Sequence, residues 1–244
     1  MRSKKSLSCL FFHIIFLLKT AVLLGQTSRE GDSLNASVYQ AKLSANILIG
    51  ENSSLYNGRE YTEVSKKIIG DPLFLHKDFV TGEVKYSGVL YSNVPLFYDL
   101  YQDELITKHM NRIFKIQLVK EKVEYFKISE HYFINATKLK YVQLNGFYEV
   151  VLDEEIKVLM KRTKRLDEQS GASEIQRTLK DKTQYFIIHN KDLFEITSKK
   201  SLKAAFPGFK NDISKWIHKS NMNFNKSKQQ SIIYVAQKIL EQQK

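Results

Sequence analysis

The chain has little cysteine, proline, glycine and tryptophan: its 244 residues include one Cys, three Pro, ten Gly and one Trp. So few prolines and glycines exclude a collagen-like or low-complexity protein. Apolar residues make up 43% of the sequence and include 15 Phe and 13 Tyr, which excludes wholesale disorder. The length fits one domain, or one domain with a small appendage, and is sufficient to enclose a hydrophobic core.

The first 25 residues have the pattern of a secretory signal peptide. Three of the first five residues are basic, an apolar run follows over 7–18, and Gly25 supplies a small residue before the expected cleavage point. Lys19 keeps the apolar run below the roughly 20 residues that span a bilayer, which favours cleavage over the alternative of an anchor helix. No later stretch is long and apolar enough to cross a membrane as a helix. We therefore expect export to the periplasm or cell envelope, with only peripheral membrane contact after cleavage.

Cleavage would also change the composition. It removes Cys9, so the mature chain would have no disulfide, no cysteine nucleophile and no thiolate metal ligand. It removes four basic residues and no acidic ones, which lowers the formal charge from +12 to +8. Residues 155–244 hold 19 basic and 9 acidic residues, whereas 26–154 hold 15 and 17, so the excess lies in the C-terminal part.

Aromatic and β-branched runs, separated by turn residues, indicate short antiparallel strands from about residue 61 onward. The expected strands are 84–91, 94–101, 113–119, 123–128, 132–137, 147–152, 156–160, 185–188 and 193–196. Ser92 and Asn93 are predicted to separate the first two. The polar stretch 165–181 is predicted to be a loop before the last hairpin. A series of this length must close, curl or be covered at its edges.

Helical spacing of apolar residues appears at both ends of the chain. A polar leader is expected over 26–36, a short helix over about 37–48, and a helical element over about 199–242. The sequence thus predicts a mainly β (α+β) fold. It consists of a curved antiparallel β-meander with a short N-terminal helix and small C-terminal helices, in one domain covering 37–244.

The densest carboxylate group beside aromatic residues is formed by Tyr98, Asp99, Tyr101 and Asp103. Two carboxylates can act as acid and base in a hydrolase that cleaves glycans, or can hold a calcium ion. Acidic residues are also common in turns, where they form local hydrogen bonds. These four residues are therefore a candidate ligand site, with a structural role as the alternative.

Aromatic side chains in the same region suggest a second kind of site. A groove for a sugar or a lipid chain could be lined by such rings, which offer a large apolar area with a polar edge. The alternative is that they pack in the core, as aromatic residues of strands commonly do. The aromatic residues concerned are Tyr86, Tyr91, Phe97, Tyr98 and Tyr101.

The most concentrated positive charge is the run Lys161, Arg162, Lys164 and Arg165, interrupted by Thr163. In an exported protein this run would suit an anionic envelope glycan, lipid or protein. A charged strand end that faces solvent is the alternative. No recognisable nucleic-acid module accompanies the run, so nucleic acid is not an expected partner.

Sequence motifs of catalysis are missing after residue 25. There is no His-Glu-x-x-His pair, no Gly-x-Ser-x-Gly elbow and no phosphate-binding Gly-x-x-x-x-Gly-Lys loop. No catalytic residue, metal or cofactor is therefore predicted. The sequence favours an envelope-associated protein with a non-enzymatic binding or assembly role. A glycan hydrolase that uses carboxylates, and a structural or stress-related envelope component, are the alternatives.

Several short blocks of the chain follow a recurring pattern. They include Leu55–Gly58, Tyr98–Leu100 and Gly146–Glu149. Together they resemble an uncharacterised family of exported proteins found in Bacteroidota. The resemblance implies export and a β-rich body. It implies no activity and no site residues.

Overall fold

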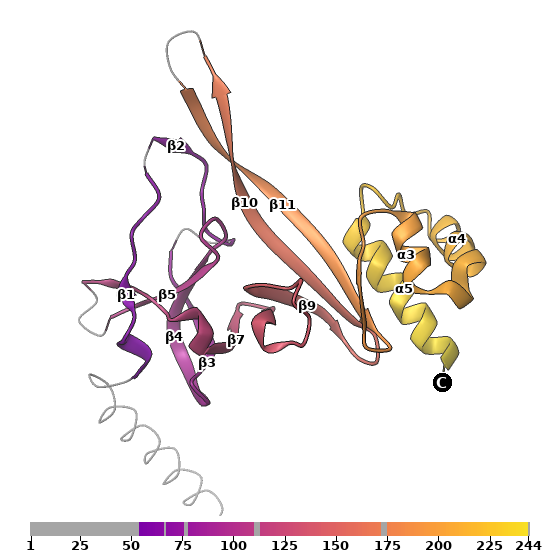
Figure 1. The fold of residues 1–244 in the computed structure, drawn as a ribbon, viewed down its shortest axis with the longest axis horizontal. Helices are drawn as coiled ribbons and strands as arrows, with labels where there is room; N and C mark the ends of the chain where they lie inside the picture. Colours follow the sequence, from indigo (N-terminus) through magenta and orange to yellow (C-terminus); the bar gives the residue numbers. More distant parts are fainter. Residues whose placement is uncertain (1–53, 66, 76–77, 110–112, 172–174, 244) are drawn as a thin grey trace, which may run out of the picture. The chain divides into compact units, whose positions relative to one another are not determined.

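The computed structural model of the protein describes residues 54–243 apart from 66, 76–77, 110–112 and 172–174 (Figure 1). The expected signal peptide, the leader and the helix over 37–48 lie outside the described residues. Within the described part of the chain, no helix has the length and apolarity needed to span a membrane. The fold is mainly β, with small helices at the C-terminal end, which confirms the predicted fold class.

The described residues form twelve strands and three α-helices. The strands are β1 (Arg59–Glu60), β2 (Ile68–Ile69), β3 (Val80–Tyr86), β4 (Val89–Asp99), β5 (Glu104–Lys108), β6 (Lys115–Gln117), β7 (Val123–Ile128), β8 (His131–Asn135), β9 (Phe147–Asp153), β10 (Lys157–Ser170), β11 (Ile175–His189) and β12 (Asp192–Glu195). The helices are α3 (Lys199–Ala205), α4 (Lys210–Lys219) and α5 (Lys228–Gln243). Four short 3-10 turns are η1 (Ser54–Tyr56), η2 (Lys120–Lys122), η3 (Ala136–Lys138) and η4 (Pro207–Phe209).

All twelve strands belong to one sheet, in the order β1-β6-β5-β4-β3-β7-β8-β9-β10-β11-β12, with β2 added beside β11. Neighbours are antiparallel except β2 and β11. The order departs from a simple meander because β7 returns to pair with β3. The sheet curves so that the backbone amide of Lys164 in β10 donates to the carbonyl of Leu100, directly after β4, at 3.1 Å.

The first hairpin turns at a different place from the one that the sequence suggested. β3 and β4 meet at Ser87 and Gly88, whose φ angles of 52° and 81° are those of a tight hairpin turn. The predicted break at Ser92 and Asn93 is wrong, because β4 runs through both residues. Asn93 (φ 59°) is the extra residue of a β-bulge, so its turn-like conformation is absorbed inside the strand.

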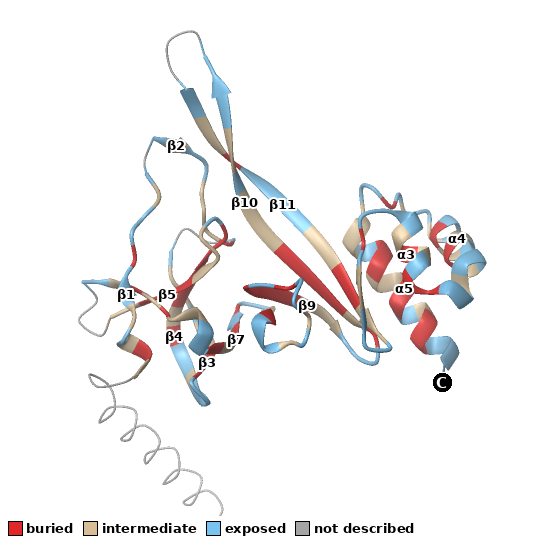
Figure 2. Ribbon diagram, viewed as in Figure 1, coloured by how far each residue is buried: buried red, intermediate tan, exposed pale blue. Residues whose placement is uncertain are grey.

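The predicted loop over 165–181 is also wrong. Residues 165–170 and 175–181 form the distal half of the β10–β11 hairpin, whose strands are paired without interruption from Lys157 opposite Ile188 to Ser170 opposite Ile175. Figure 2 shows that burial is concentrated in the proximal half, whereas in the distal half Leu179 is buried and the other described residues are exposed or intermediate. Because both faces of this ribbon meet water, it lacks the apolar alternation by which a half-buried strand is recognised.

Two large hydrophobic clusters and two smaller ones stabilise the described part of the fold. Inside the curved sheet, Phe126 and Phe133 stack at 4.7 Å, and Tyr98 and Phe147 pack edge-on against them. The second core joins the apolar sides of α3, α4 and α5 to the base of the β10–β11 hairpin, where Ile187 is fully buried. The C-terminal helices are thus attached to the sheet by apolar packing.

Candidate functional site

Asp99 is fully buried at the end of β4 and organises the turn that follows. Its Oδ1 atom accepts hydrogen bonds from the backbone amides of Tyr101 (2.8 Å) and Gln102 (2.9 Å). Its Oδ2 atom accepts from the Gln102 side-chain amide at 3.1 Å and from the Tyr61 hydroxyl at 2.6 Å. These four bonds use the accepting capacity of the carboxylate, so Asp99 holds the local structure together.

Through Tyr61, Asp99 also supports a set of aromatic rings. The Tyr61 ring lies edge-on to Phe97 at 5.4 Å between centroids, and Phe97 contacts Phe79 at 4.5 Å. Tyr61 is 7% exposed, and burial together with its bond to Asp99 raises the pKa of the Tyr61 hydroxyl. At neutral pH the hydroxyl therefore stays protonated and continues to donate to Asp99.

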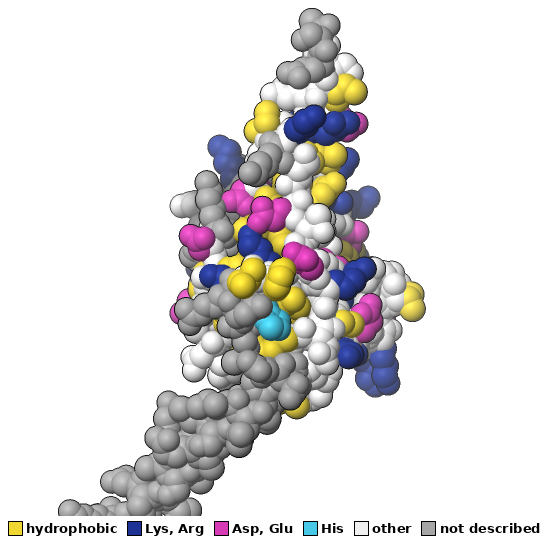
Figure 3. All heavy atoms as spheres, turned by 90° about the vertical axis from the view of Figure 1, so that its left-hand side faces the viewer, with side chains coloured by type: hydrophobic (Ala, Val, Ile, Leu, Met, Phe, Trp, Pro, Cys, Tyr) yellow, Lys and Arg dark blue, Asp and Glu magenta, His cyan; other side chains and the backbone are white. Residues whose placement is uncertain are grey.

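An open groove of about 700 Å³ lies along these three rings. That volume is within the range of small-molecule sites. The lining residues are Tyr61, Glu63, Val64, Ser65, Ile68, Gly70, Asp71, Pro72, Leu73, Asp78, Phe79, Phe97, Lys108 and Lys115. Figure 3 shows the face of the molecule that carries β1, β2 and β5, where hydrophobic side chains lie among acidic and basic ones.

The polar groups of the groove carry charges of both signs. Lys108 and Lys115 are directly opposite each other on β5 and β6. The Lys108 ammonium lies 4.7 Å from the centroid of Phe79, and Lys115 forms an ion pair with Glu63. Carboxylates at Glu63, Asp71 and Asp78 complete the set. Within the described residues, no three His, Cys, Asp or Glu side chains gather closely enough to hold a metal ion.

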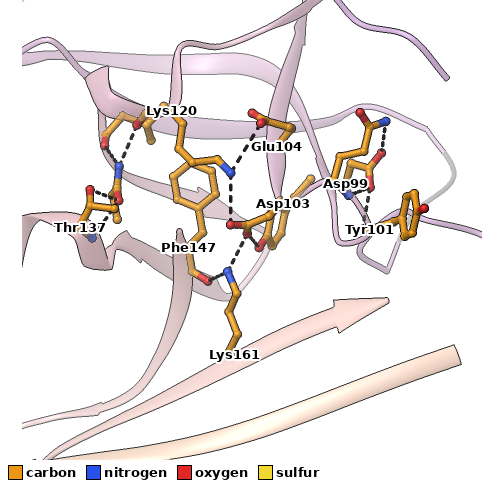
Figure 4. Close-up of polar contacts among 12 residues, drawn as sticks. Asp99, Tyr101, Asp103, Glu104, Lys120, Thr137, Phe147 and Lys161 are labelled. Carbon is orange, nitrogen blue, oxygen red and sulfur yellow. Dashed lines mark hydrogen bonds and ion pairs between the residues drawn. The ribbon is translucent and has the colours of Figure 1, made fainter. Parts of the chain in front are cut away.

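Asp103 belongs to a different network from Asp99, as Figure 4 shows. Its Oδ1 atom accepts hydrogen bonds from the Tyr98 hydroxyl at 2.5 Å and from Lys161 Nζ at 2.8 Å. Its Oδ2 atom accepts from Lys120 Nζ at 3.3 Å. Lys161 also donates to the carbonyl of Phe147 at 2.9 Å. The network therefore ties the turn before β5 to β9 and β10.

Burial shifts the protonation equilibria of this second network. It lowers the pKa of Lys161, which is 8% exposed, although the Asp103 carboxylate opposes that shift. It raises the pKa of Glu104, whose Oε2 atom is buried without a hydrogen-bond partner. Burial and the nearby Asp103 raise the pKa of Tyr98. Asp103 thus serves as the counter-ion of a buried lysine.

The candidate residues of the carboxylate site are divided between these two networks. Neither Asp99 nor Asp103 lines the groove. Tyr98 is buried in the aromatic core, and Tyr101 is 37% exposed on the turn after β4. Of the aromatic residues expected to line a groove, Phe97 does so. Tyr86 is in the core and Tyr91 packs against it.

The basic run is likewise separated, because successive residues of a strand point to opposite faces. Lys161 is buried on Asp103, and Arg162 Nε donates to Glu149 at 2.9 Å. Lys164 forms an ion pair with Asp181 at 2.7 Å. Arg165 is exposed and lies opposite Lys180 on β11. Three of the four positive charges are therefore compensated within the protein.

Sequence reasoning missed several residues of the groove, above all Tyr61, Phe79 and Lys108. Phe79 follows a stretch without regular spacing, and Tyr61 stands alone in a polar segment, so periodicity gave no signal for either. The lysine pair Lys108 and Lys115 becomes visible only when β5 and β6 are in register.

Comparison of the chain with protein-family models, with curated proteins and with solved structures found no match.

Proposed function

We propose that this is an exported, envelope-associated protein that binds a ligand without transforming it, and that the aromatic groove is its binding site. The observation that supports the proposal is the groove itself: about 700 Å³, lined by three aromatic rings and by charged groups of both signs. Concave sites with an apolar lining and a few polar groups are where proteins bind small ligands.

The lining favours a short neutral glycan as the ligand. Sugar hydroxyls donate and accept hydrogen bonds, and the groove offers acceptors on Glu63, Asp71 and Asp78 and donors on Lys108 and Lys115. A lipid chain in the same place would remove these charged groups from water and offer them no hydrogen bonds in return, which is unfavourable. The aromatic rings provide apolar area for the carbon-bearing face of a sugar ring.

A glycan hydrolase is the second candidate. Three carboxylates line the groove, and glycosidases use two carboxylates on opposite sides of the bond they cleave. The carboxylates that would perform this chemistry are those of the groove, because Asp99 and Asp103 are engaged in the two networks described above. Release of shortened sugars during a binding experiment would favour this candidate.

The test is a binding screen with neutral oligosaccharides. The labelled protein is applied to an array of neutral glycans. The tetrasaccharide that retains the protein most strongly is then titrated by calorimetry. Replacing Phe79 by Ala removes a partly buried ring of the groove, and we expect affinity to fall about tenfold. Phe114 is 44% exposed and does not line the groove, so Phe114→Ala is the matched control and should leave affinity unchanged.

Two results would overturn the proposal. One is an array on which no neutral glycan is retained. The other is an equal loss of affinity for the Phe79 and Phe114 variants, since Phe79 lines the groove and contacts Phe97, whereas Phe114 does not line it. Thermal unfolding of both variants shows whether an affinity change reflects loss of the fold.

A further inference from the structure

Positive charge is concentrated on the C-terminal helical unit, which we define as residues 197–243 and which contains α3, η4, α4 and α5. Residues 26–196 hold 24 basic and 24 acidic side chains. Residues 197–244 hold ten lysines and two acidic residues. The whole excess of +8 that would remain after signal-peptide cleavage therefore lies in these last 48 residues, on a part of the fold distinct from the groove.

Most of these lysines have no acidic partner in the described structure. Ion pairs are formed by Lys215 with Asp212 at 3.6 Å and by Lys238 with Glu241 at 2.6 Å, both within a helix. The lysines of the unit that form no ion pair with another described residue are Lys199, Lys200, Lys203, Lys210, Lys219, Lys226 and Lys228. The unit therefore presents uncompensated positive charge to its surroundings.

Two of these lysines adjoin a partly buried aromatic pair, of which one ring belongs to η4 and the other to α4. The rings of Phe209 and Trp216 lie 6.1 Å apart, and both are partly exposed at the edge of the second core. Lys210 follows Phe209 directly, and Lys219 is one helical turn from Trp216. Tryptophan beside lysine is the combination by which helices lie in the headgroup region of a bilayer.

The kind of cation also points to a diffuse surface as the partner. All ten cationic residues of 197–244 are lysines, and none is arginine. Lysine is a mobile, hydrated point charge, whereas bidentate recognition of bases and single phosphates relies on arginine. Each lysine close to a surface of anionic headgroups raises the affinity for the membrane by roughly fivefold.

We propose that the C-terminal helical unit docks the protein on an anionic phospholipid surface, with lysines on the headgroups and Trp216 at the interface. The docking is peripheral and does not depend on what the groove binds. In this arrangement the helices form the basic surface that the sequence indicated. The run 161–165 instead forms ion pairs within the sheet.

The test uses the full chain, with the same N-terminus in every variant. Vesicles of phosphatidylglycerol and phosphatidylcholine are compared with vesicles of phosphatidylcholine alone, by co-sedimentation and by tryptophan fluorescence. Trp216 is the only tryptophan of the chain, so its emission reports directly on α4. We expect a blue shift and co-sedimentation with the anionic vesicles only, and both should weaken as salt is raised.

The lysines are tested with two matched triple variants. Lys210, Lys219 and Lys226 are exposed, and changing all three to Gln should weaken vesicle binding by roughly 100-fold. Lys122, Lys138 and Lys140 are equally exposed on the sheet part of the chain, and changing these to Gln alters net charge by the same amount. We expect this control to change binding less than about twofold.

Three outcomes would overturn the proposal. The first is equal binding to neutral and anionic vesicles, and the second is an equal loss in the two triple variants. The third is a blue shift of the Trp216 fluorescence emission that appears with double-stranded DNA or an anionic polysaccharide but with neither kind of vesicle. None of these outcomes bears on glycan binding in the groove, so the two proposals fail separately.

Discussion

Lysine has opposite roles in the sheet and in the C-terminal helical unit. In the sheet, Lys161 is 8% exposed and is held by the Asp103 carboxylate and the carbonyl of Phe147. In the helical unit, Lys219 is exposed, with no carboxylate within 4.0 Å in the described structure. One region uses cations to join its strands, whereas the other leaves them available to a partner.

The difference between the two groups of lysines follows from how strands and helices bury their side chains. Antiparallel strands bring distant residues together, so Lys161 meets a carboxylate that is 58 positions away in the sequence. A small helix buries one apolar stripe and leaves its remaining sides in water. A lysine in the sheet is therefore expected to matter for stability, and a lysine of the helices for binding.

The largest expected effect comes from Gly146, which lies against the buried ion pair. Its φ is +75°, and a Cβ at this position would overlap the Asp103 carboxylate and lie 2.9 Å from Lys161 Nζ. Gly146→Ala should therefore lower the free energy of unfolding by about 4 kcal/mol, measured by urea denaturation. Gly208 of the helical unit has no atom within 4 Å of the corresponding position, so Gly208→Ala should cost less than about 0.5 kcal/mol.

Removing the buried cation should have the next largest effect. Lys161→Met leaves Asp103 with Lys120 as its remaining cation, at 3.3 Å. Because this change breaks a buried pair and leaves one charge poorly compensated, we expect a loss of about 3 kcal/mol in the same urea experiment. Lys219→Met, the matched change on the helices, should alter stability by less than about 0.5 kcal/mol. Similar losses in both variants would contradict the comparison.

Asp99 tests whether a buried acidic residue of the sheet, like the buried Lys161, matters for stability. Asp99→Asn replaces an acceptor of four hydrogen bonds with a group that has one oxygen, so we expect a loss of about 2 kcal/mol. Because Tyr61 lines the groove, glycan binding should weaken as well. A variant with unchanged stability and unchanged ligand binding would show that this carboxylate has neither role.

Glu104 provides a test through pH. Burial raises its pKa above the ordinary 4.5, so the folded protein holds this proton more tightly than the unfolded chain does. The resulting stabilisation is complete below the unfolded-state pKa and is lost as pH rises through the raised value. Glu104→Gln removes this loss. The free energy of unfolding of the variant relative to the wild type should therefore rise as pH increases from about 4 to about 7. A difference that does not change with pH would contradict this account.

The smallest effect is expected at the exposed end of the long hairpin. Arg177 and Glu168 form an ion pair at 2.6 Å, but their side chains are 43% and 50% exposed. Exposed pairs contribute little because water and salt screen them, so Arg177→Ala should cost less than about 0.5 kcal/mol in urea denaturation. A cost above about 1 kcal/mol would mean that the distal half is as firmly packed as the proximal half.

The hairpin also shows where prediction from the sequence failed. The strands 185–188 and 193–196 were recognisable because their aromatic and β-branched residues pack against other parts of the protein. The distal half of β10 and β11 has charged residues on both faces, stabilised by cross-strand pairs such as Glu168 with Arg177. Such pairs depend on register, which appears only once the two strands are aligned.

The candidate site could be predicted only in part for a related reason. Asp99 and Asp103 are four positions apart, yet the turn between them directs one towards Tyr61 and the other towards Lys161. Spacing in the sequence says little about convergence where the backbone reverses, and Asp103 itself has a φ of +57°. Phe97 was one of the aromatic residues considered for a groove and does line it, but its partners Tyr61 and Phe79 come from segments without regular periodicity.

The sequence by itself determined the mainly β character, the C-terminal helices and the total charge, because periodicity and composition are local or additive properties. Only the tertiary structure decided which charges remain free. The run 161–165, the densest positive charge in the sequence, is mostly neutralised by acidic residues that folding brings beside it. Most of the more widely spaced lysines of the helices have no carboxylate partner among the described residues, because the only two acidic side chains in that part of the sequence are each paired within a helix.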